Sequence, residues 1–310
     1  MDITYLLWLQ DFRNSINDAL TPFMEWISYF GVREVLLLAV FIYWCIDKRK
    51  GLFILFAWKI SQTLNAIVKL TACVYRPWVR DARIIPAGDA IKSAGGYSFP
   101  SGHTMMAAPI LGGVAVSFAN KFLRFLCIAG ILLVMFSRNY LGVHTPQDVV
   151  IGALLGFLGI YISGRLLNYM DKHPEKDNLV MFLSGLAGVL TLVYVSYKPY
   201  PMDYVDGKLL VDPVKMTVDA WGDAGGLAVL AIAWYIEKRF VKFTPTGFNV
   251  KGVILCIIGL IPLWWGVYSL RGVVSGVLGK HLGKLAAQSI MLFYIMIIWP
   301  LVLKMFARKS

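Results

Sequence analysis

Long apolar runs, each of about 20 residues and separated by short polar segments, dominate the pattern of this chain. A helix of that length crosses a hydrocarbon core of roughly 30 Å. The alternation of apolar and polar residues that marks membrane strands is absent from the sequence. The pattern therefore predicts an all-α fold, a polytopic membrane helical bundle of about nine transmembrane helices, near residues 28–46, 51–75, 102–119, 122–140, 147–167, 179–197, 218–236, 250–270 and 284–304.

The beginning of the chain differs from these runs. The apolar stretch Leu6 to Leu9 is followed by Asp11 and Arg13, so the segment is too short and too polar to span. We expect an amphipathic helix that lies in the membrane interface, with no cleaved signal. The predicted organisation is an interfacial N-terminal segment, a core that carries the polar motifs described below, and additional transmembrane helices packed on that core, at residues 1–26, 27–170 and 171–310.

The composition agrees with a membrane protein, because 58% of the residues are hydrophobic and only 15% are charged. The formal net charge of +12 does not indicate nucleic-acid binding, since the basic residues gather in short connections such as 47–50 and 237–239. Connections of that kind face the cytoplasm and anionic lipids. We expect membrane lipids and no nucleic acid as partners. With the N-terminus outside, the inner segments hold a modest excess of Lys and Arg.

The cysteines lie in or beside apolar runs and show no paired spacing. We expect them to be small buried packing residues, and neither disulfide partners nor zinc ligands. They are Cys45, Cys73, Cys127 and Cys256.

Three polar segments stand out because each lies at the edge of an apolar run, where charged residues are costly. On the expected topology all three meet at the outer, non-cytoplasmic face of the membrane. Together they supply three cations, two imidazoles and one carboxylate, a set suited to binding a phosphate group and attacking it. They are Lys69 with Arg76-Pro77, then Pro100-Ser101-Gly102-His103, and then Ser137-Arg138 with His144 and Asp148.

The first segment places two cations close together. Lys69 and Arg76 are seven residues apart, which on a helix separates them by only about 20°. Both would then lie on one face, and Pro77 would end the helix at the surface. A lone Lys near a helix end usually snorkels to the interface, as we expect for Lys59. Two cations on one face instead predict an anion site.

The second segment opens an apolar run. Ser101 is placed to cap the helix that follows, which leaves the backbone N–H groups of Gly102 and His103 at the positive end of that helix. Such an end binds anions readily, and a glycine lets the ligand approach the backbone closely. His103 adds a titratable donor beside the anion.

The third segment joins two apolar runs. Arg138 ends one run, Thr145 is placed to cap the next helix, and Pro146 would be its first residue. Asp148 comes four residues after His144 and is able to reach back to it. A carboxylate on one imidazole nitrogen fixes the tautomer and leaves the lone pair of the other nitrogen exposed, as a histidine nucleophile requires.

In this order, Lys-x6-Arg-Pro, Pro-Ser-Gly-His and Ser-Arg-x5-His-x3-Asp resemble the signature motifs of the type-2 phosphatidic acid phosphatase superfamily. All three motifs match without departure, over residues 69–148. The superfamily includes lipid phosphate phosphatases, polyprenyl diphosphate phosphatases, glucose-6-phosphatase, sphingosine-phosphate phosphatases and the soluble vanadium haloperoxidases. The resemblance implies that residues 27–170 form a phosphatase core that works without a metal.

The resemblance also implies a role for each motif residue. His144 would attack the phosphorus and form a phosphohistidine, Asp148 would orient it, and His103 would protonate the leaving oxygen. The remaining motif residues would bind the phosphoryl oxygens: Lys69, Arg76, Ser101, Gly102 and Arg138.

The connection at residues 78–99 is longer than helix packing requires, and a loop of this length beside a site is often a lid. We hypothesise that Arg80 or Arg83 contacts a second phosphate or a head group, although a solvated outer loop is the simpler interpretation. Asp81 and Asp89 do not have the spacing of a carboxylate metal cage. We therefore expect no metal and no other cofactor.

Four titratable residues outside the motifs have simpler interpretations. His173 lies in a charged inner loop and is expected to be solvated, and His281 is expected at the interface. Asp219 and Asp223 flank Trp221, and we interpret them as anchors at the membrane surface.

The sequence thus predicts a membrane phosphatase for a lipid phosphate or a polyprenyl diphosphate at the outer membrane face. Three alternatives remain open: a phosphatase for a soluble sugar phosphate, a lipid phosphotransferase, and a lipid binder or transporter without catalysis. The transporter is disfavoured because the sequence shows no internal repeat and no helix broken at mid-membrane.

Overall fold

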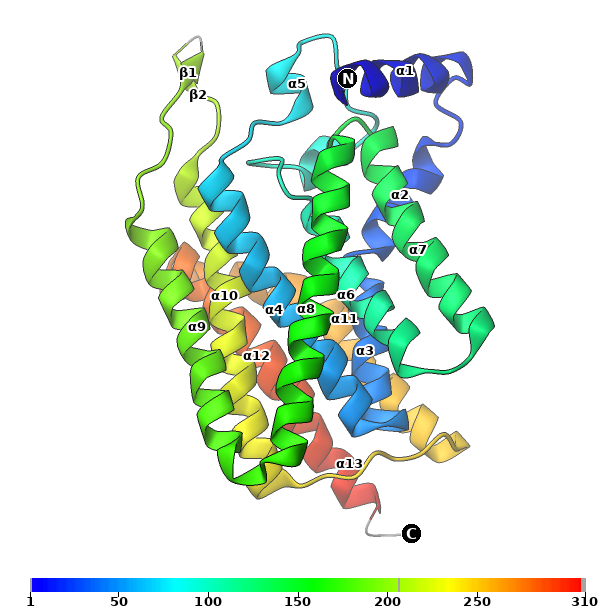
Figure 1. The fold of residues 1–310 in the computed structure, drawn as a ribbon, viewed down its shortest axis with the longest axis vertical. Coiled ribbons are helices and arrows are strands. Elements are labelled where there is room, and N and C mark those ends of the chain that lie inside the picture. The colour runs from blue at the N-terminus through cyan, green and yellow to red at the C-terminus, as the bar shows by residue number, and fades with distance from the viewer. Residues whose placement is uncertain (1, 206, 308–310) are drawn as a thin grey trace.

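The computed structural model describes residues 2–205 and 207–307, whose regular secondary structure is helical apart from one hairpin (Figure 1). The strands of the hairpin, β1 (Tyr204–Val205) and β2 (Lys208–Leu209), pair antiparallel. The α-helices are α1 Asp2–Ser15, α2 Thr21–Phe30, α3 Glu34–Phe41, α4 Lys48–Ala72, α5 Pro77–Arg80, α6 Gly102–Ser117, α7 Lys121–Tyr140, α8 Pro146–Lys172, α9 Asp177–Tyr197, α10 Pro213–Ile236, α11 Val250–Leu278, α12 Lys280–Phe293 and α13 Trp299–Ala307.

Short 3-10 and π segments extend or connect these helices. The 3-10 turns are η2 (Ala90–Ser93) and η3 (Pro174–Lys176), and the π turns are η1 (Ile42–Ile46), η4 (Glu237–Val241) and η5 (Tyr294–Ile298).

The described residues contain seven helical segments that are long and apolar enough to cross a membrane, or eight if the bent pair within α11 is one span. The multi-pass helical architecture is thereby confirmed, whereas the expected nine spans are not found. The seven segments are Thr21–Ile46, Lys48–Arg80, Lys121–Tyr140, Pro146–Lys172, Pro174–Tyr197, Pro213–Val241 and Lys280–Phe306.

The expected span at 102–119 accounts for part of the difference. It corresponds to α6, which has only 16 residues and is buried along most of its length. At 1.5 Å per residue it reaches about 24 Å, less than a hydrocarbon core of about 30 Å. Because α6 packs against α4, α7 and α8, its apolar residues face protein rather than lipid.

The N-terminal helix α1 lies across one end of the bundle, and α13 lies at the opposite end (Figure 1). Leu6 and Leu9 of α1 are buried, while Trp8 and Phe12 are exposed, an arrangement that suits an interfacial helix. The Arg13 guanidinium fixes α1 to the protein by donating to the carbonyl of Ile85 at 2.8 Å. The first candidate span begins at Thr21, several residues before the expected start.

The centre of the bundle is the contact of α4 with α6, α8 and α10. Two glycines of α8 permit this packing. A Cβ on Gly159 would lie 2.1 Å from Ser61 Oγ, and one on Gly156 would lie 2.8 Å from the Cβ of Ala108. Any larger residue at these two positions would push α8 away from α4 and α6.

The helices after residue 171 pack directly on this core. Helix α10 contacts both α4 and α9, and α12 contacts α10. The Trp44 indole donates to the carbonyl of Ile295 at 2.8 Å, which joins η1 to η5. The cysteines are all free, with Cys45, Cys127 and Cys256 buried and Cys73 partly buried.

Candidate active site

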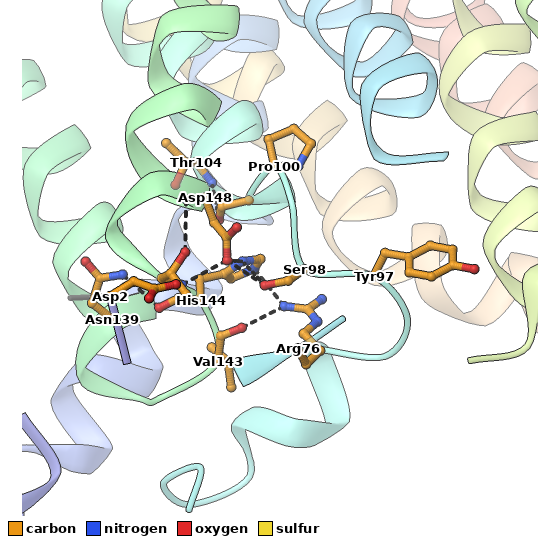
Figure 2. A network of polar contacts seen from close by, with 12 residues as sticks. Asp2, Arg76, Tyr97, Ser98, Pro100, Thr104, Asn139, Val143, His144 and Asp148 are labelled. Carbon is orange, nitrogen blue, oxygen red and sulfur yellow. Dashed lines mark hydrogen bonds and ion pairs between the residues drawn. The ribbon is translucent and has the colours of Figure 1, made fainter. Parts of the chain in front are cut away.

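The three polar segments meet where the C-terminal ends of α4 and α7 approach the N-terminal ends of α6 and α8 (Figures 1 and 2). Backbone hydrogen bonds hold these ends together. The Ser101 N–H donates to the Asp148 carbonyl at 2.9 Å, and the N–H groups of Val143 and His144 donate to the Arg138 carbonyl at 3.2 and 3.3 Å. The turn that carries His144 is therefore fixed to both neighbouring helices.

The carboxylate of Asp148 is the centre of a buried hydrogen-bond network (Figure 2). Its Oδ2 atom lies 3.2 Å from His144 Nδ1 and accepts from the Thr145 N–H at 2.8 Å. Ser98 Oγ donates to the same oxygen. Thr145 and Asp148 form a capping box at the start of α8, as their sequence positions predict. The cap of α8 thus also positions the imidazole.

Arg76 fixes the tautomer of His144. Its NH1 atom lies 2.8 Å from His144 Nε2 and also donates to the Val143 carbonyl at 2.9 Å. A guanidinium carries donors only, so Nε2 must accept and cannot carry the proton. The proton is then on Nδ1, facing Asp148. His144 presents a lone pair toward a cation, which is the position that a phosphate would take.

Burial lowers the pKa of the His144 imidazole well below its usual range, and the positive charges of Arg76, Arg138 and Lys69 lower it further. His144 is 1% exposed, and it is neutral at neutral pH. Only the neutral imidazole has a free lone pair, so this environment maintains the nucleophilic form.

The spacing predicts that Lys69 and Arg76 share a helix face, but the structure shows that they do not. Helix α4 ends at Ala72 because Cys73 adopts a left-handed conformation, with φ of 48°. Arg76 is extended, with ψ of 153°, as expected for a residue before proline. Its Nε atom donates to the Gly96 carbonyl at 3.1 Å. The Lys69 ammonium donates to the carbonyls of Tyr97, Ser98 and Pro100.

The second motif is built as a helix start. Ser101 caps α6 by accepting from the Thr104 N–H at 3.5 Å, and its side chain is fully buried. Gly102 and His103, at the first turn, line the same cavity as His144. Ser101 therefore shapes the turn, while Gly102 and His103 face the open space.

Arg138 is buried at 1% exposure. Its NH1 atom donates to Ser28 Oγ. Its Nε and NH2 atoms have no hydrogen-bond partner among the described residues. Buried donors of this kind are costly when they are unpaired, and a bound phosphate oxygen would satisfy them.

One cavity of about 630 Å³ opens onto these residues. Among the motif residues, those that line it are Lys69, Arg76, Gly102, His103 and His144. Its walls continue along α10, α11 and α12, so the helices outside the motif region also face this space.

The head-group hypothesis requires Arg80 or Arg83 to face the cavity, and neither residue lines it. Arg80 pairs with Asp2 of α1 at 2.8 Å, and Arg83 pairs with Asp81 at 2.7 Å. Neither residue is part of the cavity wall, because each guanidinium is held by a carboxylate on the outer side of the loop. The loop cation that does line the cavity is Lys92.

The titratable residues outside the motifs are distributed differently from the expectation. His173 is exposed beside Glu175, as predicted, and His281 lies 2.9 Å from Thr217 Oγ1. Asp219 and Asp223 are not surface anchors, because both line the cavity. They lie on successive turns of α10, and Asp219 pairs with Lys284 of α12 at 3.0 Å.

Two residues of the site were not predicted from the sequence. Ser98 bonds the Asp148 carboxylate from a loop 50 residues away, and no motif spacing indicates that contact. Asn139 Nδ2 donates to the His144 carbonyl at 2.9 Å. The only available sign was its place directly after Arg138. Within the described residues, no group of three or more His, Cys, Asp or Glu side chains is arranged to hold a metal ion.

Comparison with known proteins gives the same assignment as the motifs. Residues 50–171 match the model of the PAP2 superfamily. An undecaprenyl-diphosphatase of Sulfolobus acidocaldarius is 30% identical over 152 residues, which are 46% of this chain and 71% of that protein. The chain belongs to the PAP2 superfamily. The resemblance drawn from the motifs is thus confirmed.

Two relatives from Bacillus subtilis extend the comparison. Phosphatidylglycerophosphatase B is 34% identical over 122 residues, 36% of this chain and 55% of that protein. Undecaprenyl-diphosphatase BcrC is 29% identical over 165 residues, 50% of this chain and 81% of that protein. The chain is therefore homologous to phosphatases, although it spans only about half of the first of these. No solved structure matches the chain.

Proposed function

We propose that this protein is a metal-independent membrane phosphatase that hydrolyses a lipid phosphate or a polyprenyl diphosphate through a phosphohistidine. The observation that carries the proposal is the pair of contacts on His144. Asp148 lies on Nδ1 at 3.2 Å and the Arg76 guanidinium lies on Nε2 at 2.8 Å. The lone pair of Nε2 is thus aimed at a cation inside a cavity, where a phosphate would bind.

The reaction proceeds in two steps. In the first, His144 Nε2 attacks the phosphorus and the bond between phosphorus and the leaving oxygen breaks. His103 donates a proton to that oxygen from its imidazolium form, which the negative charge of the bound phosphate favours. In the second, His103 takes a proton from water, the water oxygen attacks the phosphorus, and the bond to His144 breaks. Phosphate is released and both imidazoles return to their starting state.

The cations supply the electrostatic stabilisation that the phosphoryl group needs in the transition state. Arg76 exchanges its contact with Nε2 for phosphoryl oxygens. Arg138, which lies behind the cavity wall, adds its positive charge, and its unpaired Nε and NH2 atoms reach the same group once the wall adjusts around the phosphate. Lys69, held by three loop carbonyls, completes the anion site with the backbone of Gly102. Asp148 stabilises the positive charge that develops on His144.

The proposal includes a site that faces the non-cytoplasmic side of the membrane. The segments at the opposite end of the bundle, which include residues 47–50 and 237–239, carry a modest excess of Lys and Arg. Cytoplasmic loops carry such an excess of Lys and Arg.

Phosphate release from the detergent-solubilised protein in the presence of EDTA tests the proposal. The wild type should remain active with the chelator, and His144→Ala should be inactive. Vanadate at millimolar concentrations should inhibit, because it bonds to a histidine as a mimic of the pentacoordinate phosphorus. Undiminished release by His144→Ala would overturn the nucleophile assignment, and loss of activity in EDTA would overturn metal independence.

A further inference from the structure

The cavity has a second half that lies outside the catalytic motifs. Its walls there come from α10, α11 and α12, none of which belongs to the region matched by the superfamily at residues 50–171. Polar side chains from these helices face the same open space as His144. They are Lys215, Asp219, Asp223, Arg271, Lys284 and Gln288.

Of the two carboxylates in this half, Asp219 has close ion-pair partners and Asp223 does not. Asp219 pairs with Lys284 at 3.0 Å and with Arg271 at 3.4 Å. Asp223 lies one helical turn further along α10 and makes no hydrogen bond or close ion pair with the described residues. The nearby Lys59 was expected to snorkel to the interface, but it is fully buried. Its ammonium instead faces the carbonyl of Gly222 in α10.

Asn65 is a second acceptor without a partner. It is 7% exposed, it lines the cavity, and its Oδ1 atom has no hydrogen-bond partner among the described residues. Across the cavity, the Nε2 atom of Gln288 is likewise buried and unpartnered. Buried polar atoms are normally hydrogen-bonded, so Asn65 and Gln288, with the partly buried Asp223 in the same cavity wall, indicate a polar ligand.

The position of these residues places the ligand beside the phosphate. Asn65 Nδ2 lies 3.9 Å from the point that a Cβ on Gly102 would occupy, and Asn65 is one turn of α4 before Lys69. Lys69 lines the same cavity as Asp219 and Asp223, and the charges of Asp148, Asp223 and Asp219 all act on its ammonium. Lys69 is therefore shared by the histidine site and the second half.

We propose that Asn65 and Asp223 form a subsite for the hydroxyl groups of a polyol whose phosphate monoester enters the histidine site. A carboxylate and an amide oxygen accept hydrogen bonds from hydroxyls. A second phosphate in the same place would present acceptor oxygens to Asn65 Oδ1 and the Asp223 carboxylate, which are acceptors too, so these contacts would stay unmade. The inference rests on the proposed function, and it selects a polyol phosphate over a diphosphate as substrate.

The polyol is either a lipid head group or a soluble compound, and one set of assays distinguishes these sources. The full chain in detergent is assayed with phosphatidylglycerol phosphate, glycerol 3-phosphate and phosphatidic acid. Of these three, phosphatidic acid has no free hydroxyl beside the phosphate that reacts. The wild type should prefer a glycerol-bearing substrate over phosphatidic acid by about tenfold or more in kcat/KM. Cleavage of glycerol 3-phosphate identifies a soluble source, and cleavage of the lipid alone identifies a head group.

Asp223→Asn, which keeps the volume but removes the charge, should lower kcat/KM for the preferred glycerol substrate about tenfold and change that for phosphatidic acid less than about twofold. Asn65→Leu, the second variant, should show the same selective loss. Asp171→Asn, at the far end of the bundle, is the matched control and should change neither value.

Equal losses on both substrates, or no loss on either, would overturn the polyol subsite. The polyol subsite would also be overturned if the wild type preferred undecaprenyl diphosphate, or if it cleaved phosphatidic acid and the glycerol substrates equally fast. In those cases the proposed function still stands. A wild type that releases phosphate from none of these compounds would overturn the proposed function and the subsite with it.

Discussion

Replacement of Asp148 by Asn removes a buried negative charge beside the nucleophile. The carboxylate lies 3.2 Å from His144 Nδ1, with both side chains at most 3% exposed. At an effective dielectric constant of about 20, a charge at that distance stabilises the developing imidazolium by about 5 kcal/mol. Since about 1.4 kcal/mol is tenfold in rate, Asp148→Asn should lower kcat about 10³- to 10⁴-fold. KM should change less than about threefold, because the carboxylate does not line the cavity.

The assay is steady-state phosphate release from detergent micelles, with thermal unfolding measured on the same samples. Asp148 also caps α8, so the variant should lose about 0.5–2 kcal/mol of stability and still fold at the assay temperature. Asp81→Asn is the control, because Asp81 pairs with exposed Arg83 away from the cavity. A loss of kcat below about tenfold in folded protein would refute the idea that Asp148 stabilises charge on His144.

Three further predictions follow from the buried contacts. Ser98→Ala removes a donor to the Asp148 carboxylate and should lower kcat about 10- to 100-fold. The control is Ser117→Ala, because the Ser117 hydroxyl bonds within α6. Equal kcat values for the two variants would contradict a role of Ser98 in positioning Asp148. Because the pKa of His144 is held low in the folded state by burial and by Arg76, the unfolded chain binds more protons below pH of about 6.5, and stability should fall as pH decreases through that range. Unfolding midpoints of wild type and His144→Gln measure this, and identical pH slopes would refute it. Lys48→Ala leaves the buried Glu237 carboxylate without its ammonium partner and should lower the free energy of unfolding by about 3–5 kcal/mol. An unchanged unfolding midpoint would contradict this prediction.

The parts of the site that are local in sequence could be predicted. His144 and Asp148 meet because an i to i+4 pair at a helix start brings them together, and the caps by Ser101 and Thr145 follow from residue type and position. Helical periodicity failed for Lys69 and Arg76, because α4 ends at Ala72, where Cys73 adopts a left-handed conformation, and Pro77 keeps Arg76 in extended backbone. The two cations still line one cavity.

Contacts between distant segments could not be predicted from spacing. Ser98 joins Asp148 across 50 residues, and Arg80 joins Asp2 across 78. The expected nine spans are not found among the described residues for a related reason. An apolar run has the same sequence pattern whether it faces lipid or protein, and α6 faces protein. The direction of Asp219 and Asp223 likewise depends on how α10 packs against α12.

The central claim is that His144 Nε2 bonds to phosphorus during turnover. The most direct measurement is to mix the protein with a ³²P-labelled substrate, quench it with base within the first turnover, and identify the labelled peptide. The account predicts base-stable, acid-labile label on the peptide that contains His144, and none in His144→Ala. Label on another residue, or rapid turnover of the wild type with no labelled protein at any time, would contradict it.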